Sequence, residues 1–179
     1  MKSRTQLLGL TGTNGAGKGA AADFFQNNGF SFFSLSDVIR EELKGDGLEP
    51  SRDNLIKKGN DLRQEFGPDI LARRVLERVA DKSVIDSIRN PEEIRFLRAR
   101  ENFVLLAIDA PAKLRFERVS KRGRMESAST LEEFIEKEAE EKTQNRKGQQ
   151  LHICLEMADW TIINDSSLES FHAKLEKFL

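Results

Sequence analysis

The chain has 179 residues, of which 38% are hydrophobic and 33% charged, and its formal net charge is −1. This length suits one domain, expected to span residues 1–179 and to bury roughly 70% of the surface of its unfolded chain. A nearly neutral protein has no overall attraction to nucleic acid or to an anionic membrane, so we expect neither as a partner. The single cysteine, Cys154, excludes an internal disulfide framework.

The apolar runs of the chain are short. None approaches the length of about 18 residues that a membrane span needs, and the first residues lead into a predicted strand without a signal-peptide pattern. We therefore expect a cytoplasmic protein, in which Cys154 is a buried and unreactive thiol within the apolar run 153–155. Trp160 is expected in the core, and no feature of the sequence indicates an oligomeric state.

Apolar periodicity predicts strands that alternate with helices. The expected strands are 6–10, 30–34, 83–86, 104–109 and 160–163. The expected helices are 18–28, 38–44, 54–66, 69–80, 92–100, 112–122, 131–143, 149–158 and 167–179. Ser36 or Asp37 is expected to cap the helix 38–44, because their oxygens accept free N–H groups. The alternation predicts a three-layer α/β/α sandwich around a five-stranded parallel sheet.

The residues after the first strand match a phosphate-binding pattern. Gly12, Gly17 and Lys18 satisfy the first seven positions of G-x-x-x-x-G-K-[ST], whereas Gly19 stands where a magnesium-binding hydroxyl is expected. Glycines let successive N–H groups point at an anion at a helix N-terminus, and the lysine adds a charge. A glycine-rich turn with a surface lysine is the alternative, but the order strand, loop, lysine, helix favours a nucleotide. The expected ATP contacts are Gly12, Thr13, Asn14, Gly15, Ala16, Gly17, Lys18, Gly19 and Ala20.

Charged residues follow two other predicted strands, at the sheet edge where α/β proteins bind ligands. Asp86 is expected to hold Mg²⁺, directly or through water, because Mg²⁺ needs only one or two carboxylates beside nucleotide phosphates. Its alternative role is to cap the following turn. Arg40 and Arg89 are expected to bind a substrate phosphate. Their alternative is an exposed ion pair with a neighbouring glutamate, of which there are four: Glu41, Glu42, Glu92 and Glu93.

A basic helix face precedes a polar loop. Arg115, Arg118 and Arg122 are spaced by three and four residues and so share that face. Cations there suit a closing lid, since they neutralise charge that develops on a transferred phosphoryl group. We expect this role for Arg118 and Arg122, and a solvated position balanced by the acidic helix 132–141 for Arg115 and Lys121.

These motifs resemble adenylate kinase and related nucleoside monophosphate kinases, whose phosphate loop also has glycine after its lysine. That family carries Thr or Ser at the position of Ala20. SDVIR at 36–40 is similar to its monophosphate-binding segment, and VIDSIR at 84–89 to its acceptor-binding turn, with the arginine shifted by about one place. IDAP through ERVSKR, within 108–122, resembles the strand and helix before its lid. The resemblance also implies a phosphate-binding role for Arg146.

Both ends of the chain resemble dephospho-coenzyme A kinase instead. The similar stretches are GLTG at 9–12 and ADWTIIND with SLE, within 158–169. Both resemblances imply a P-loop nucleotide kinase that uses ATP and Mg²⁺, and they differ in the acceptor. They also imply a helical acceptor-binding insert at about 37–67 and a short lid at about 122–147.

Together these features predict transfer of the γ-phosphate of ATP to a small nucleotide, namely a nucleoside or deoxynucleoside monophosphate. Dephospho-coenzyme A is the alternative acceptor, and a nucleotide-binding regulator with weak ATPase activity is a third reading. A nucleic-acid end kinase is disfavoured by the net charge. The expected catalytic residues are Lys18, Asp86, Arg118 and Arg122. The expected substrate-binding residues are Ser36, Asp37, Arg40 and Arg89.

Overall fold

A computed structural model of the chain describes residues 6–79, 81–122, 129–144 and 150–179. Its centre is a five-stranded sheet in the order β2-β3-β1-β4-β5, and every pair of neighbouring strands is parallel. The strands are β1 (Gln6–Gly12), β2 (Ser31–Ser34), β3 (Lys82–Asp86), β4 (Phe103–Asp109) and β5 (Trp160–Ile163). The predicted α/β sandwich with a five-stranded parallel sheet is confirmed.

Helices connect consecutive strands, as parallel pairing requires. Those of the first half are α1 (Lys18–Asn27), α2 (Leu35–Gly45), α3 (Arg52–Phe66), α4 (Ile70–Leu76) and α5 (Pro91–Arg98). Those of the second half are α6 (Ala112–Lys121), α7 (Leu131–Gln144), α8 (Leu151–Glu156), α9 (Leu168–Leu175) and the 3₁₀ turn Glu176–Phe178. Among the described residues, no helix is long and apolar enough to span a membrane.

Alternating side chains of the central strand supply two separate apolar cores. Leu8 and Leu10 pack with Phe25 in a cluster that also takes in α9. Leu7 points to the other face and joins a cluster that contains Leu97 of α5. Burying each such side chain contributes about 1.5–3 kcal/mol. Because both faces are covered, the polar ligand-binding groups are confined to the edges of the sheet.

Two expectations about burial have different outcomes. Cys154 is fully buried, and burial raises the pKa of its thiol to about 12, so the prediction of an unreactive thiol agrees with the structure. The prediction for Trp160 is wrong, because its side chain is 52% exposed. Trp160 lies on β5, the last strand of the sheet, where its ring contacts Phe178 and lies 4.2 Å from Lys177 Nζ.

The start of α2 also differs from the prediction that Ser36 or Asp37 caps it. The helix begins at Leu35, so both residues lie in its first turn. Leu35 is only 1% exposed and packs in the core. Burial of Leu35 places the start of the helix directly after β2. Ser34 occupies the cap position but makes no cap hydrogen bond.

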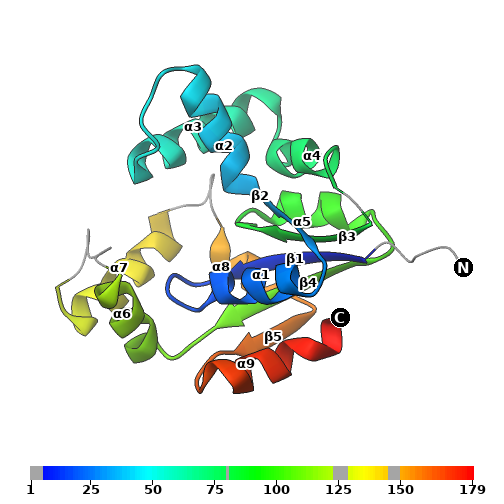
Figure 1. Cartoon of the computed structure of the whole chain (residues 1–179). Coiled ribbons are helices and arrows are strands. Elements are labelled where there is room, and N and C mark those ends of the chain that lie inside the picture. Colours follow the sequence, from blue (N-terminus) through cyan, green and yellow to red (C-terminus); the bar gives the residue numbers. More distant parts are fainter. Residues whose placement is uncertain (1–5, 80, 123–128, 145–149) are drawn as a thin grey trace, which may run out of the picture.

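The segments predicted to bind the acceptor and to form the lid lie on opposite sides of the loop after β1. Figure 1 shows α2 and α3 beyond β2, and α6 with α7 at the other side of that loop. The predicted insert at 37–67 therefore consists largely of α2 and α3. The predicted lid at 122–147 contains α7, whereas 123–128 and 145–147, with Arg146, lie outside the described residues.

Candidate active site

The backbone of the loop between β1 and α1 accommodates only glycine at several points, of which Gly12 and Gly17 are the most crowded. Gly17 precedes α1 with φ 108°, a left-handed conformation that other residues rarely adopt, and a Cβ there would overlap Asn164 Nδ2. A Cβ on Gly12 would overlap the carbonyl oxygen of Ile108. Gly19 differs, because a Cβ there would meet no atom within 4 Å. The loop thus requires Gly12 and Gly17 for its shape, and Gly19 is not needed for space.

Two strand ends brace this loop. Thr13 Oγ1 donates a hydrogen bond of 2.8 Å to Asp109 Oδ1 at the end of β4. Asn164, just after β5, donates from Nδ2 to the carbonyl of Ala16 at 2.8 Å. The Asn164 N–H in turn bonds to the Asp109 carbonyl at 2.8 Å. The sequence placed Asp109 and Asn164 at strand ends, which was the available signal, but it indicated no contact with the loop.

Lys18 lies across the loop. Its ammonium donates to the carbonyls of Gly12 at 2.8 Å and Thr13 at 3.0 Å. Burial is the largest cause that lowers its pKa, to about 8, and the positive charges of three arginines lower it further. The negative charge of Asp86 acts in the opposite direction. The arginines are Arg89, Arg115 and Arg122. Asp86 and these arginines therefore all lie close enough to Lys18 to affect its charge.

Asp86 ends β3, the strand beside β1. Its Oδ1 is buried and has no hydrogen-bond partner among the described residues. A buried polar atom without a partner is uncommon and costly, so this oxygen is suited to a cation or a ligand donor. Its other oxygen, Oδ2, accepts a hydrogen bond from Ser87 Oγ in the following turn at 3.4 Å.

In the described part of the chain, Asp86 belongs to no cluster of metal-ligating side chains. The described residues include no group of three or more His, Cys, Asp or Glu side chains that could hold a metal ion. Mg²⁺ commonly uses one or two carboxylates and completes its shell with phosphate oxygens and water. The buried Oδ1 fits that role, whereas Gly19 and Ala20 contribute no hydroxyl.

Arg118 of α6 contacts the phosphate loop. Arg118 donates from Nη2 to the carbonyl of Asn164 at 3.0 Å, and its Nη1 lies 3.4 Å from the carbonyls of Gly15 and Ala16. Arg122 follows the last residue of α6 and is exposed. Arg118 thus lies along the loop, while Arg122 remains accessible near Lys18.

Arg115, on the same face of α6, has the kind of partner that was predicted but not the predicted exposure. The acidic helix does supply its partner, since Arg115 pairs with Glu138 of α7, Nη2 lying 2.9 Å from Oε2. The predicted solvation is wrong, because Arg115 is only 7% exposed. Its Nε donates to the Ala110 carbonyl at 2.8 Å and its Nη1 reaches the carbonyl of Asn14 at 3.4 Å. Arg115 therefore joins α7 to the phosphate loop, and Lys121 is exposed as expected.

The predicted acceptor-binding residues of α2 interact with one another. Arg40 Nη1 donates to Ser36 Oγ and to Asp37 Oδ1, both at 2.7 Å, and the side chains of Arg40 and Asp37 are about half exposed. The glutamates expected as partners pair with other arginines instead. These pairs are Glu41–Arg78, Glu42–Arg74, Glu92–Arg95 and Glu93–Arg63.

Serine hydroxyls join the ends of β2 and β3 beside Asp86. Ser34 Oγ lies 2.9 Å from Ser36 Oγ and donates to Ser87 Oγ at 3.0 Å. Ser87 has φ 67° and is the one non-glycine residue with positive φ in the described part of the chain. Such backbone strain costs on the order of 1–3 kcal/mol and is typical of functional sites. No pattern in the sequence indicates strain at Ser87.

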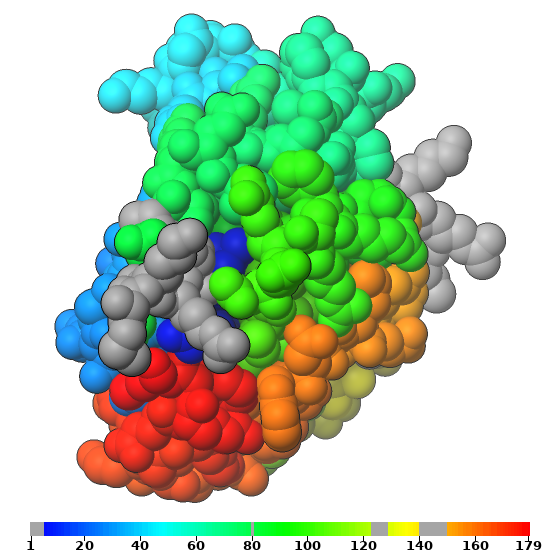
Figure 2. Space-filling view, turned by 90° about the vertical axis from the view of Figure 1, so that its right-hand side faces the viewer, coloured from blue at the N-terminus to red at the C-terminus, as the bar shows by residue number. Residues whose placement is uncertain are grey.

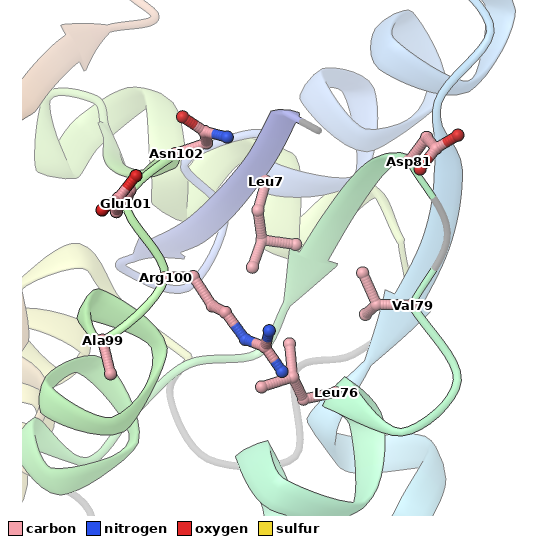
Figure 3. A pocket seen from close by; sticks show the side chains of 8 residues that line it. All are labelled: Leu7, Leu76, Val79, Asp81, Ala99, Arg100, Glu101 and Asn102. Atoms are coloured by element: carbon pink, nitrogen blue, oxygen red, sulfur yellow. The ribbon is translucent and has the colours of Figure 1, made fainter. Parts of the chain in front are cut away.

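A pocket of about 400 Å³ lies at the opposite edge of the sheet, near the amino ends of the strands. Figure 2 shows that side of the molecule. Figure 3 shows Leu7 of β1 and Leu76 at this pocket, with Asp81 and Arg100 among the polar side chains around it. None of the predicted site residues lines this pocket, so it is separate from the site around Lys18.

Two sequence comparisons show which family the chain belongs to. A family model described as an AAA domain matches residues 11–135. The UPF0200 protein TK1334 from Thermococcus kodakarensis is 32% identical over 95% of this chain and 94% of that protein. The chain belongs to the UPF0200 family.

Solved structures similar to this UPF0200 chain include kinases. TT1252 from Thermus thermophilus has a TM-score of 0.62 and 20% identity, covering 97% of this chain and 96% of that one. Shikimate kinase from Aquifex aeolicus has a TM-score of 0.58 and 17% identity, covering 96% and 94%. At these identities the likeness concerns the fold alone. This UPF0200 chain therefore has the P-loop kinase fold.

Proposed function

We propose that this UPF0200 protein transfers the γ-phosphate of ATP to a nucleoside or deoxynucleoside monophosphate. The observation that carries the proposal is the convergence of Lys18, the partnerless oxygen of Asp86, Arg89 and Arg122 at one edge of the sheet. A lysine at the phosphate loop, one free carboxylate oxygen and accessible arginines are the groups that phosphoryl transfer requires. The fold supports the same reaction class.

The donor half of the site is assigned to the phosphate loop. Its backbone N–H groups and Lys18 would hold the phosphates of ATP, with Lys18 leaving the carbonyls of Gly12 and Thr13 that it now contacts. Asp86 would hold Mg²⁺, directly or through water. The ion would supply positive charge to the phosphates. Because the loop carries no hydroxyl at Gly19 or Ala20, the carboxylate of Asp86 is the principal protein ligand in this proposal.

The acceptor half is assigned to α2 and to the turn after β3. Arg40 and Arg89 would bind the acceptor phosphate, and that phosphate would replace Asp37 as the partner of Arg40. Ser36 would contribute its hydroxyl beside Arg40. Arg118 and Arg122 would neutralise charge on the transferring group, as an arginine at the phosphate does in other phosphotransferases. Positioning and charge neutralisation suffice, and no covalent enzyme intermediate is needed.

Dephospho-coenzyme A is a second candidate acceptor. The observation that favours it is the contact of Asn164 with the Ala16 carbonyl, because Asn164 belongs to the 158–169 stretch that resembles dephospho-coenzyme A kinase. That contact makes the stretch part of the nucleotide site in this proposal. A hydroxy acid is a further acceptor to assay, since shikimate kinase shares the fold.

An acceptor panel tests the proposal. ADP formation from ATP and Mg²⁺ is measured with each ribonucleoside and deoxynucleoside monophosphate, with dephospho-coenzyme A and with shikimate. We expect ADP formation that depends on one nucleoside monophosphate. Stimulation by dephospho-coenzyme A or shikimate alone would replace the acceptor assignment. Slow phosphate release from ATP, unaffected by any acceptor, would instead support a regulator with weak ATPase activity and contradict the proposal.

A further inference from the structure

We propose that Glu93 is a positioning residue, which links the acceptor-side helix α3 to the turn that carries Arg89 through a buried ion pair with Arg63. The inference rests on the proposed function, because it assigns Arg89 to the acceptor. Glu93 touches no expected substrate group itself. Its role would be to fix where the backbone of Arg89 lies relative to α3.

The two oxygens of Glu93 bind two different parts of the molecule. Oε1 accepts hydrogen bonds from Arg63 of α3, at 2.8 Å from Nη2 and 3.2 Å from Nε. Oε2 accepts the backbone N–H groups of Arg89 at 3.1 Å and Asn90 at 3.0 Å. The side chain of Glu93 is 0% exposed and that of Arg63 is 6% exposed. One carboxylate therefore bridges α3 and the Arg89 turn inside the core.

Stability alone does not account for a charged pair at this place. Removing two charges from water costs several kcal/mol per ion, and well-packed apolar side chains are often as stabilising as a buried pair. Burial is the largest effect on Glu93 and raises the pKa of its carboxyl, while Arg63 lowers it. Of the hydrogen bonds that Glu93 accepts, a capping box needs only the one donated by the N–H of Asn90. The bonds to Arg63 and to Arg89 go beyond capping.

The surroundings hold both ends of the bridge in place. One turn before Arg63, a Cβ on Gly59 would lie 3.3 Å from Arg63 Nη1 and 2.9 Å from Ile39 Cδ1 of α2. The guanidinium is thus enclosed where α3 packs on α2. At the other end, the Arg89 carbonyl accepts the N–H of Gln150 at 2.8 Å. A displacement of α2 and α3 when an acceptor binds would reach the Arg89 backbone through Glu93.

The first variant is Glu93→Gln, which keeps the shape of the side chain. A Gln amide nitrogen cannot accept a hydrogen bond, so either Arg63 or the backbone N–H groups lose a partner. We expect the KM for the acceptor to rise about tenfold, because misplacement of a positioning group by less than 1 Å has effects of this size. The KM for ATP should stay within about twofold, since the phosphate loop makes no contact with Glu93 in this account.

A double variant separates positioning from stability. In Arg63→Met/Glu93→Leu, apolar side chains replace both charges, so no unpaired charge remains in the core. The N–H groups of Arg89 and Asn90 lose their acceptor, and we expect a lower melting temperature for that reason. The acceptor KM should still rise about tenfold while the KM for ATP stays within about twofold, which a general loss of stability would not produce. The matched control is Arg74→Met/Glu42→Leu, which removes an ion pair between α4 and α2 that does not reach the Arg89 turn. The control should leave both KM values unchanged. If the Arg63→Met/Glu93→Leu variant also leaves the acceptor KM unchanged, the positioning role is wrong.

A readout without substrate distinguishes this inference from the proposed function. Hydrogen exchange of the Arg89 and Asn90 amides in the ligand-free protein should be faster by about tenfold or more in Glu93→Gln and in the Arg63/Glu93 double variant than in the control. Unchanged exchange would overturn the inference even if the acceptor panel identifies a substrate. Faster exchange with no active acceptor would support the linkage to the Arg89 turn and contradict the proposed function instead.

Discussion

The phosphate loop and the acceptor-side residues reach the same edge of the sheet but differ in how they are held. The loop is braced from β4 and β5, where Thr13 bonds to Asp109 and Asn164 bonds to Ala16. Arg40, by contrast, is about half exposed and pairs with Asp37 of its own helix. The backbone of the proposed donor site is therefore held in shape without a ligand, and only the Lys18 side chain would exchange its contacts. In the proposed acceptor site, the ion pair between Arg40 and Asp37 would have to exchange partners.

This difference has a consequence for recognition. A site whose side chains and backbone are already ordered in the folded protein binds a ligand that fits it at a lower entropic cost. Exposed side chains that exchange partners can adapt to several anions. In the proposed function, the phosphate loop would select ATP, and the choice of acceptor would depend on side chains around Arg40 that exchange partners on binding.

The largest effect is expected for Lys18 of the phosphate loop. Lys18→Ala should lower kcat/KM by about 10²–10³, because one well-placed electrostatic contact contributes about 3–4 kcal/mol to the transition state. Steady-state kinetics at saturating acceptor checks it. Near-wild-type turnover would remove Lys18 from the site, whereas a comparable loss in Arg40→Ala would show that the two regions contribute equally.

Two glycines of the loop test the bracing itself. Gly17→Ala should destabilise the protein by about 2 kcal/mol and weaken ATP binding, because Gly17 has φ 108° and its Cβ would overlap Asn164. Gly19→Ala is the matched control and should be neutral or stabilising by up to about 1 kcal/mol, since that position is open and helical. Urea unfolding and ATP titration measure both, and equal effects at the two positions would contradict the account.

The pH dependence of ATP binding tests the buried lysine. The pKa of Lys18 in the ligand-free protein is lowered to about 8, so its ammonium loses its proton as the pH rises through 8. Because the phosphates bind the charged form, the Kd for ATP should increase above pH 8 by up to about tenfold per unit. Lys18→Arg keeps its charge over this range and should lack the dependence. A flat wild-type profile between pH 7 and pH 9.5 would be inconsistent with this role.

The smallest effect is expected for the half-exposed ion pair between Asp37 and Arg40. Asp37→Asn releases Arg40 from an ion pair of half-exposed groups. Such pairs contribute about 0.2–1 kcal/mol, so the acceptor KM should fall by no more than about fivefold while the KM for ATP stays constant. Initial-rate measurements with each substrate varied in turn decide this. A rise in the acceptor KM would mean that Asp37 orients Arg40 instead of competing with the acceptor.

The positions of the strands along the chain and the course of the phosphate loop were accessible from the sequence, because they depend on local patterns. Apolar runs located β1 and β3, and the glycine spacing located the helix N-terminus at Lys18. Contacts between distant segments were not accessible. Glu93 entered the sequence analysis only as a partner in the exposed ion pairs that were the alternative for Arg40 and Arg89. Its buried partner is Arg63, which is 30 positions away. Arg115 likewise became buried because α7 packs against α6, which no local pattern indicates.

Transfer of labelled phosphate tests the central claim most directly. ATP labelled with ¹⁸O in its γ-phosphate is incubated with the protein, Mg²⁺ and a mixture of nucleoside monophosphates, and the products are analysed by mass spectrometry. We predict that the label appears in a nucleoside diphosphate in a one-to-one ratio with ADP, and that Lys18→Ala abolishes it. Label found only in inorganic phosphate would contradict the assignment of this site to a nucleotide kinase.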